Sequence, residues 1–168
     1  MNIRVATISD LKSIVEIYNQ AVDEGFCTAD LDHVTVSDRE EWFKQHSSHK
    51  YPIFVAENKN IISGWCSLSP HRSGRKALES IAEISFYIHK SFRRQGVGKQ
   101  LIEYSLREAP KLGFKNLFAL LIDLNNASIN ILKKHGFTQW GHLPEIADFN
   151  GKICGQFIYG KRLYTLNG

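Results

Sequence analysis

The segment from Arg93 to Lys99 combines the residue types that bind phosphate groups. It reads Arg-Arg-Gln-Gly-Val-Gly-Lys and lies between an expected strand and an expected helix. Glycines let the backbone approach a ligand closely, and the first N–H groups of a helix have no partner inside that helix. Together with the helix dipole and the neighbouring cations, these donors suit a phosphate. The alternative is a solvated basic turn at a glycine-rich helix start, and the segment alone leaves both interpretations open.

Two other phosphate-binding motifs are excluded by single positions. A P-loop requires a glycine at position 93 and a serine or threonine at position 100, where Arg93 and Gln100 stand. The Rossmann fingerprint requires a third glycine at position 101, where Leu101 stands. The segment also follows an expected hairpin, whereas the Rossmann motif follows a first parallel strand.

Metal and nucleic-acid chemistry are not favoured. The chain has seven histidines but no HxxxH or HExxH pair, so we expect no metal site. Its three cysteines lie far apart without a CxxC pair, which fits reduced thiols. The net charge of +4 is compatible with an anionic ligand but is too small for a nucleic-acid footprint.

Hydrophobic spacing predicts the elements that position the basic segment. The continuous apolar run at 117–122 is typical of a buried central strand, and apolar residues alternate along 82–88. This order of elements is that of a mixed α/β sheet with helices packed on it. The expected elements are a strand at 3–5, a helix at 11–22 capped by Ser9, a helix at 37–43 with a capping box from Ser37, strands at 53–57 and 61–68, a loop at 70–80, a strand at 82–88, a helix from 97, a strand at 117–122, a helix at 126–135, and strands at 137–140 and 156–163.

Length and composition indicate one ordinary domain over residues 1–168. Apolar residues make up 43% of the chain and charged residues 23%, which is enough to form a core and excludes intrinsic disorder. No apolar run approaches the roughly 18 to 20 residues of a membrane span, and the N-terminus lacks the layout of a signal peptide. We therefore expect a soluble, cytoplasmic protein without a membrane partner.

Several segments in the right order make the chain resemble the GCN5-related N-acetyltransferases, the GNAT family. Residues 93–98 match the signature (Gln/Arg)-x-x-Gly-x-(Gly/Ala), and 125–129 with 135–137 resemble the second signature. Within the family, the phosphinothricin and methionine-sulfone acetyltransferase group is most similar, through 17–19, 28–30, 64–70 and 82–88. The resemblance covers nearly the whole chain. It implies a mostly antiparallel sheet that splays at the cofactor site, with helices on both faces.

The resemblance also implies where acetyl-CoA binds. The cofactor would lie between the strands at 82–88 and 117–122, with backbone groups near Phe86 to Ile88 holding the pantetheine arm. Backbone N–H groups of the basic segment would bind the pyrophosphate, as donors fixed in place before the ligand arrives. The implied cofactor-binding residues are Phe86, Tyr87, Ile88, Arg93, Arg94, Gln95, Gly96, Val97, Gly98, Lys99 and Asn125.

Glu83 occupies the position of the general base in the family. A protonated amine cannot attack an acetyl group, so a carboxylate must take its proton directly or through water. The alternative is an ordinary strand carboxylate that faces solvent. Many relatives carry Tyr or His in the helix after the asparagine as the acid for the leaving thiolate, but Leu132 stands there. Either the acid is missing, or Tyr87 or a water replaces it.

Acceptor recognition departs from the pattern of this group. Relatives that take phosphinothricin-like amino acids have Tyr-Arg shortly before the catalytic glutamate, where Leu78 and Glu79 stand. Arg72 and Arg75 remain in the preceding loop as candidates for an anionic group, although a surface arginine is often only solvated. Thr28 and Tyr87 are the other substrate-binding candidates; for Thr28 the alternative is turn chemistry. Tryptophans 42, 65 and 140 are expected in the core or in a pocket wall.

These observations favour an acetyl-CoA-dependent N-acetyltransferase for the primary amine of a small molecule, an amino acid or analogue. Transfer would be direct in a ternary complex, since no cysteine lies in the cofactor strand or its loop. Three alternatives stay open: a non-catalytic acyl-CoA sensor, an enzyme for a protein amine, and a nucleic-acid binder. Members of the similar group pair as dimers, so a homodimer is expected.

Overall fold

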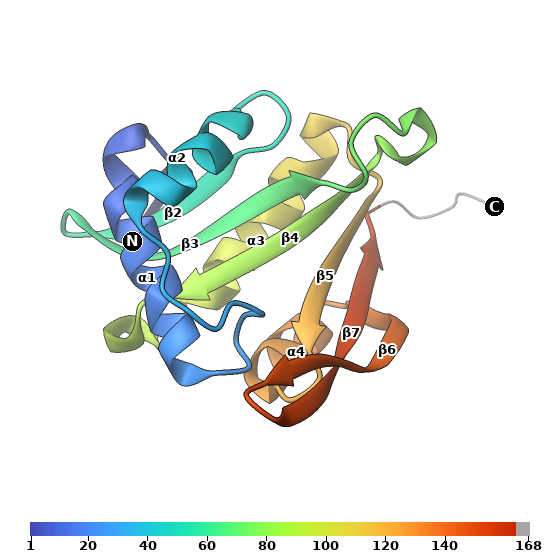
Figure 1. Cartoon of the computed structure of the whole chain (residues 1–168). Coiled ribbons are helices and arrows are strands. Elements are labelled where there is room, and N and C mark those ends of the chain that lie inside the picture. Colours follow the sequence, from blue (N-terminus) through green and yellow to red (C-terminus); the bar gives the residue numbers. More distant parts are fainter. Residues whose placement is uncertain (164–168) are drawn as a thin grey trace.

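A computed structural model describes residues 1–163, so the last part of the expected domain, 164–168, lies outside the described residues (Figure 1). The elements alternate in the predicted order of strand, helix pair, hairpin, strand, helix, strand, helix and hairpin. The helices are α1 (Leu11–Glu24), α2 (Val36–Gln45), α3 (Val97–Glu108) and α4 (Asn126–Lys134), and the strands are β1 (Asn2–Val5), β2 (Ile53–Asn58), β3 (Ile61–Pro70), β4 (Ile81–Ile88), β5 (Asn116–Ile122), β6 (Thr138–Phe149) and β7 (Lys152–Arg162).

The strands form one sheet in the order β1-β2-β3-β4-β5-β7-β6. Neighbouring strands are antiparallel except for the pair β4 and β5. These two are paired only between 81–83 and 116–118, although β4 continues to Ile88 and β5 to Ile122. Beyond the paired part the strands diverge, as the open wedge between them in Figure 1 shows. The predicted splay is therefore confirmed.

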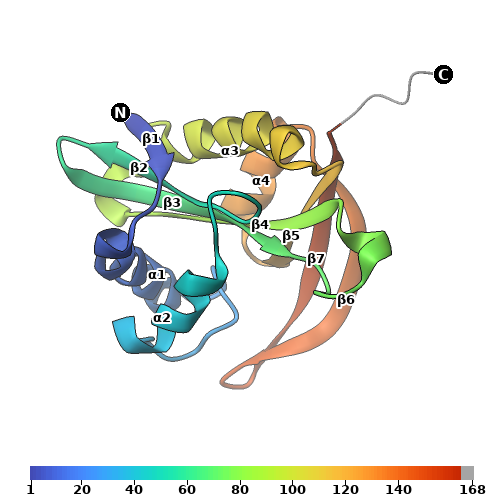
Figure 2. The same ribbon diagram turned by 90° about the horizontal axis from the view of Figure 1, so that it is seen from above.

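Helices cover both faces of the sheet, as predicted (Figure 2). Helices α1 and α2 lie on one face of β2 to β4, and α3 and α4 lie on the other. The apolar sides of α3 and α4 pack on the sheet in the larger core cluster, and α1 packs on the opposite face in a smaller one. Fully buried side chains of the larger cluster include Leu68, Ile84, Leu101, Ile102, Leu117 and Leu132.

The C-terminal hairpin is longer than the sequence predicted. Strands expected at 137–140 and 156–163 run over Thr138–Phe149 and Lys152–Arg162 instead. The pairing of β6 with β7 is irregular between Gln139 and Gly141 and between Leu143 and Ala147. Each irregularity breaks the alternation that reveals a strand in a sequence. Most of β6 is also exposed, so no clear apolar face marks it.

Both predicted N-caps were wrong: Asp10, and not Ser9, directly precedes α1, and Thr35, and not Ser37, caps α2. The first helical turn begins after Thr7, whose backbone N–H donates to the Asp10 carboxylate at 2.8 Å, and Ser9 lies inside that turn. Helix α2 begins after Thr35: its hydroxyl accepts from the Asp38 N–H at 3.1 Å, and its own N–H donates to the Asp38 carboxylate at 2.7 Å. In each case an earlier threonine pairs with an aspartate three residues later, which is the capping-box spacing.

Candidate active site

Alternate residues of β3 and β4 form the floor of a cavity of about 280 Å³. Every second side chain of a strand points to the same face, so residues paired across the two strands lie side by side on the floor. The opposite face of the same strands is buried against α3. The floor residues, each with its register partner, are Trp65 and Tyr87, Ser67 and Ser85, and Ser69 and Glu83.

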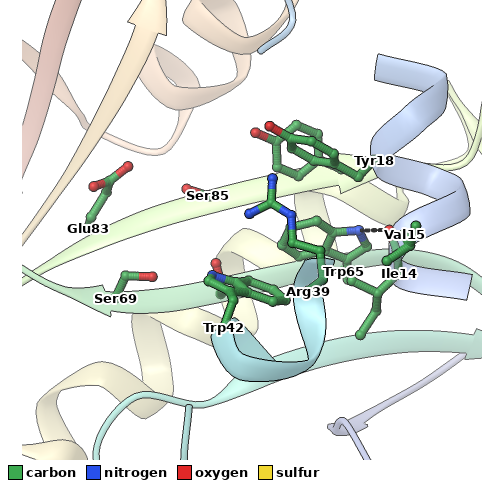
Figure 3. A pocket seen from close by; sticks show the side chains of 11 residues that line it. Ile14, Val15, Tyr18, Arg39, Trp42, Trp65, Ser69, Glu83 and Ser85 are labelled. Atoms are coloured by element: carbon green, nitrogen blue, oxygen red, sulfur yellow. Dashed lines mark hydrogen bonds between the residues drawn. The ribbon is translucent and has the colours of Figure 1, made fainter. Parts of the chain in front are cut away.

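Helices α1 and α2 supply the wall of this cavity (Figure 3). Tyr18 of α1 contacts Tyr87 edge to face, with 5.1 Å between ring centroids. Trp42 of α2 contacts Trp65 at 5.7 Å, and the Trp65 indole N–H donates to the Ile14 carbonyl at 3.1 Å. The prediction that tryptophans 42 and 65 form core or pocket wall is confirmed, whereas Trp140 is 45% exposed on β6. The cavity thus has an aromatic wall and a polar end.

Glu83 lies at the polar end of the cavity, on the last residue of β4 that is paired with β5. Its side chain is half-buried, and in Figure 3 it stands beside Ser69 and Ser85. Burial raises the pKa of the Glu83 carboxyl, and a hydrogen bond from Ser85 lowers it in part. A carboxylate with a raised pKa is a better proton acceptor near neutral pH.

Arg39 brings a positive charge into the same cavity from α2. Its guanidinium lies over the ring of Tyr18 at 4.7 Å and near that of Trp42 at 5.7 Å. One nitrogen donates to the Asp30 carboxylate at 3.1 Å. A guanidinium carries five N–H donors, so others remain for a ligand in the cavity. In Figure 3 Arg39 projects between the aromatic wall and the serine end of the floor.

A second, larger cavity of about 860 Å³ begins where β4 and β5 diverge. The start of α3 lies in its wall, and Gly96 caps that helix with a left-handed backbone, φ 82°. An α-helix N-terminus with nearby cations suits a phosphate group. A Cβ on Gly98 would meet Ile131 at 3.2 Å, so this glycine allows α3 and α4 to pack closely. The groove therefore combines a helix N-terminus with cations, an arrangement that suits an anionic group.

Most of the predicted cofactor residues line this groove, and one does not. Gln95 is not part of the lining, and its side-chain amide donates to the Ser91 carbonyl at 2.9 Å. Asn125 is buried in the wall, where its side-chain oxygen caps α4 by accepting from the Ser128 N–H at 3.2 Å. The predicted residues that line the groove are Phe86, Tyr87, Ile88, Arg93, Arg94, Gly96, Val97, Gly98, Lys99 and Asn125.

Tyr87 is a lining residue of both cavities, so the two cavities lie next to each other along β4. Burial raises the pKa of its hydroxyl, which makes this phenol a weaker acid than usual. Leu132 is fully buried in the larger core cluster and offers no proton. Leu132 therefore cannot protonate a thiolate leaving group, and Tyr87 is a weaker proton donor than an ordinary phenol.

The remaining predicted substrate residues lie outside the cavity wall. Arg72 and Arg75 are exposed on the loop between β3 and β4 and are absent from the lining of both cavities. Thr28 is buried just behind the wall, where its hydroxyl lies 2.6 Å from the Tyr18 hydroxyl. The structure thus puts Thr28 in contact with a wall residue and leaves the two loop arginines in solvent.

Sequence reasoning missed several residues of the cavity. For the serines the signal was present, because alternate residues of a strand face the same side of the sheet. Ser67 and Ser69 face the same side as Trp65, and Ser85 faces the same side as Glu83. For Arg39 no local signal existed, because its place depends on how α2 packs on α1. Among residues 1–163, no group of three His, Cys, Asp or Glu side chains is arranged to hold a metal ion, and no helix is long and apolar enough to cross a membrane.

Known proteins match this chain over nearly its whole length. The Acetyltransferase (GNAT) family matches residues 11–137. A Bacillus subtilis (strain 168) protein named "Putative phosphinothricin acetyltransferase YwnH" is 39% identical over 164 residues, 97% of this chain and 99% of that protein. The L-methionine sulfoximine/L-methionine sulfone acetyltransferase of Salmonella typhimurium is 29% identical over 146 residues, 87% of this chain and 85% of that protein. A solved structure of a GNAT superfamily phosphinothricin acetyltransferase from Sinorhizobium meliloti in complex with AcCoA has a TM-score of 0.89 and 25% identity, with 96% and 87% of the two chains covered.

The chain belongs to the GNAT family of acetyltransferases. It is an N-acetyltransferase that uses acetyl-CoA to acetylate small amines. The predicted family, fold, enzyme class and co-substrate are thereby confirmed.

Proposed function

We propose that the acceptor is an amino acid or a close analogue, of the type named for the relatives: methionine sulfone, methionine sulfoximine or phosphinothricin. The observation that carries this proposal is the pair of charges in one cavity, Glu83 at one end and Arg39 in the wall. An amino acid has a matching pair, an amine for Glu83 and a carboxylate for Arg39. A guanidinium binds a carboxylate through two parallel hydrogen bonds.

In this proposal the acetyl group moves directly from sulfur to nitrogen. Glu83 takes one proton from the ammonium group, either directly or through water, so that the free amine attacks the acetyl carbonyl. The new C–N bond forms, the C–S bond breaks, and the second amine proton leaves to water. The thiolate takes a proton from water, because Leu132 has none to give and burial raises the pKa of the Tyr87 hydroxyl. A CoA thiolate is a tolerable leaving group, so turnover does not depend on a strong acid.

We propose the following binding roles. Backbone N–H groups at the start of α3 hold the pyrophosphate, with Arg93, Arg94 and Lys99 adding positive charge. Backbone groups of Phe86, Tyr87 and Ile88 hold the pantetheine arm where β4 leaves β5. Gly96, Val97, Gly98 and Asn125 line the groove, Gln95 shapes the loop through Ser91, and Thr28 supports the wall through Tyr18.

The test compares acceptors that differ in one group. Thiol release from acetyl-CoA is measured with methionine sulfone, with its carboxamide, and with the amine that lacks the carboxyl group altogether. We expect turnover with all three acceptors. We expect kcat/KM to be about 10- to 100-fold higher for the free acid, because a hydrogen-bonded charge pair contributes a free energy that corresponds to this ratio. Equal kcat/KM for acid and carboxamide would refute the amino-acid acceptor. Saturable acetyl-CoA binding without thiol release from any amine would favour the sensor alternative.

We also propose that two copies of this chain form a homodimer through the C-terminal strands. Several exposed apolar side chains lie on these strands, and exposed apolar surface favours association. We propose that the protein is cytoplasmic, because the thiols of Cys27, Cys66 and Cys154 are free. We also propose that residues 1–168 form one domain. Light scattering of the purified protein tests the dimer. The exposed apolar residues of β5, β6 and β7 are Leu120, Trp140, Leu143, Ile146 and Ile153.

A further inference from the structure

His46, the residue directly after α2, is hydrogen-bonded to Ser69, which lines the smaller cavity, here called the acceptor cavity. The Nδ1 atom of His46 lies 2.8 Å from the Trp42 carbonyl oxygen, and the Nε2 atom lies 3.1 Å from the Ser69 hydroxyl oxygen. A carbonyl oxygen only accepts, so Nδ1 carries the hydrogen of this bond. In the neutral ring Nε2 is then the acceptor, and the Ser69 hydroxyl donates its hydrogen to it.

Burial and contacts favour this neutral form. The ring of His46 lies against that of Trp42, with centroids 4.7 Å apart, and burial lowers the pKa of the imidazole. The hydrogen of Ser69 is therefore committed to His46. What Ser69 presents to the cavity is an oxygen with free lone pairs, which accepts a hydrogen bond and cannot donate one.

Ser69 stands directly opposite Glu83 in the pairing of β3 with β4, and both side chains line the cavity. The polar end thus places a hydroxyl acceptor next to a carboxylate acceptor (Figure 3). An ammonium group has three N–H donors and satisfies both acceptors at once. Two contacts fix its orientation, whereas a single carboxylate leaves it free to rotate.

We propose that Ser69 binds the acceptor's ammonium group beside Glu83, and that His46 is a positioning residue that keeps the Ser69 hydroxyl turned as an acceptor. This inference rests on the proposed function, because it assumes an amine in this cavity. The reaction keeps its proton balance: Glu83 takes the proton, and Ser69 only holds the nitrogen in line.

The first test is Ser69→Ala, measured by thiol release with methionine sulfone as acceptor. Loss of a hydrogen bond to a charged group predicts a rise of about 10- to 100-fold in the KM for the acceptor. The KM for acetyl-CoA stays the same, because Ser69 is outside the cofactor groove. The matched control is Ser63→Ala, a fully buried serine of the same strand whose hydroxyl donates to the Ala56 carbonyl. That variant alters thermal stability and leaves both KM values unchanged.

The second test is His46→Phe, which keeps a ring against Trp42 and removes the acceptor for Ser69. We expect the acceptor KM to rise about 3- to 10-fold, as for loss of one neutral hydrogen bond. The double variant Ser69→Ala/His46→Phe matches Ser69→Ala alone, because His46 acts only through Ser69. Additive effects in the double variant would overturn the positioning role.

Ser69→Ala and His46→Phe could instead lower the melting temperature and leave the acceptor KM unchanged. That result would show that the hydrogen bond between His46 and Ser69 only stabilises the packing of α2 on the sheet, and it would overturn the inference. If the wild type turns over no amine, the proposed function fails and this inference with it. If the wild type is active and Ser69→Ala is normal, the inference alone fails.

Discussion

Replacing Glu83 by glutamine tests the proposed chemistry most directly. The substitution keeps the size of the side chain, and it removes the group that takes the proton. Glu83 forms no ion pair within residues 1–163, so the change leaves no partner charge unpaired. A positioned general base accelerates a reaction about 10²- to 10⁴-fold, which is about 3 to 5 kcal/mol of activation free energy. We expect kcat to fall by that factor.

The assay is thiol release at saturating acetyl-CoA and saturating acceptor, with acetyl-CoA binding measured separately by calorimetry. Binding stays at the wild-type value, because Glu83 lines the acceptor cavity and not the cofactor groove. In the wild type, kcat/KM falls on acidification because Glu83 takes up a proton. Since burial raises the pKa of Glu83, this acidic limb of the pH profile lies at a higher pH than the ordinary carboxyl pKa. The limb disappears in Glu83→Gln. A variant within about threefold of the wild-type kcat, against the expected minimum of 10²-fold, would refute Glu83 as the base.

The same raised pKa has a consequence for stability that runs opposite to activity. As the pH falls through the pKa of Glu83 in the folded protein, the folded state takes up a proton that the unfolded chain still lacks, so stability rises until the pH reaches the ordinary carboxyl value. At neutral pH the buried carboxylate is charged and this gain is absent. Glu83→Gln therefore melts at a higher temperature than the wild type at neutral pH, and the difference shrinks toward pH 4. A lower melting temperature at neutral pH would contradict the burial argument.

Three further variants separate binding, backbone strain and packing. Arg39→Gln raises the KM for methionine sulfone about 10- to 100-fold and leaves the KM for an amine without a carboxylate unchanged, as thiol release will show. Gly96→Ala lowers the free energy of unfolding by about 1 to 2 kcal/mol, measured with urea, because φ at this position is 82° and only glycine adopts it without strain. A steric clash does not contribute, since the nearest neighbour of an added Cβ, the side chain of Gln100, is 3.8 Å away. Leu132→Ala costs about 2 to 5 kcal/mol of unfolding free energy, since its side chain is fully buried, while kcat stays within twofold because Leu132 supplies no proton.

The cofactor side of the protein was predictable because its signals are local. The basic segment from Arg93 to Lys99 is contiguous, and its proposed function depends on backbone N–H groups at one helix start. The alternation at 82–88 and the apolar run at 117–122 identify the two strands that diverge. Neither feature requires knowledge of distant packing, so the pattern of a single sequence is enough.

The acceptor side was harder to predict because its residues meet only in the folded chain. Arg39 enters the cavity through the packing of α2 on α1, and no spacing within 36–45 marks it as a ligand. The link between His46 and Ser69 spans 23 residues of sequence. The irregular pairing of β6 hid that strand for a related reason, since a register shift destroys the alternation on which strand prediction depends.

The position of the positive charge connects these observations. The chain carries Glu79 where similar enzymes are expected to hold an arginine, and Glu79 is exposed on the loop before β4. A cavity that binds an amino acid still needs a cation for the carboxylate. In the proposed function Arg39 of α2 provides it, held in place by Asp30 and by the rings of Tyr18 and Trp42. If α2 supplies this cation while β4 and α3 hold the base and the cofactor, as we propose, acceptor specificity can change in this fold without any change in the machinery for acetyl transfer.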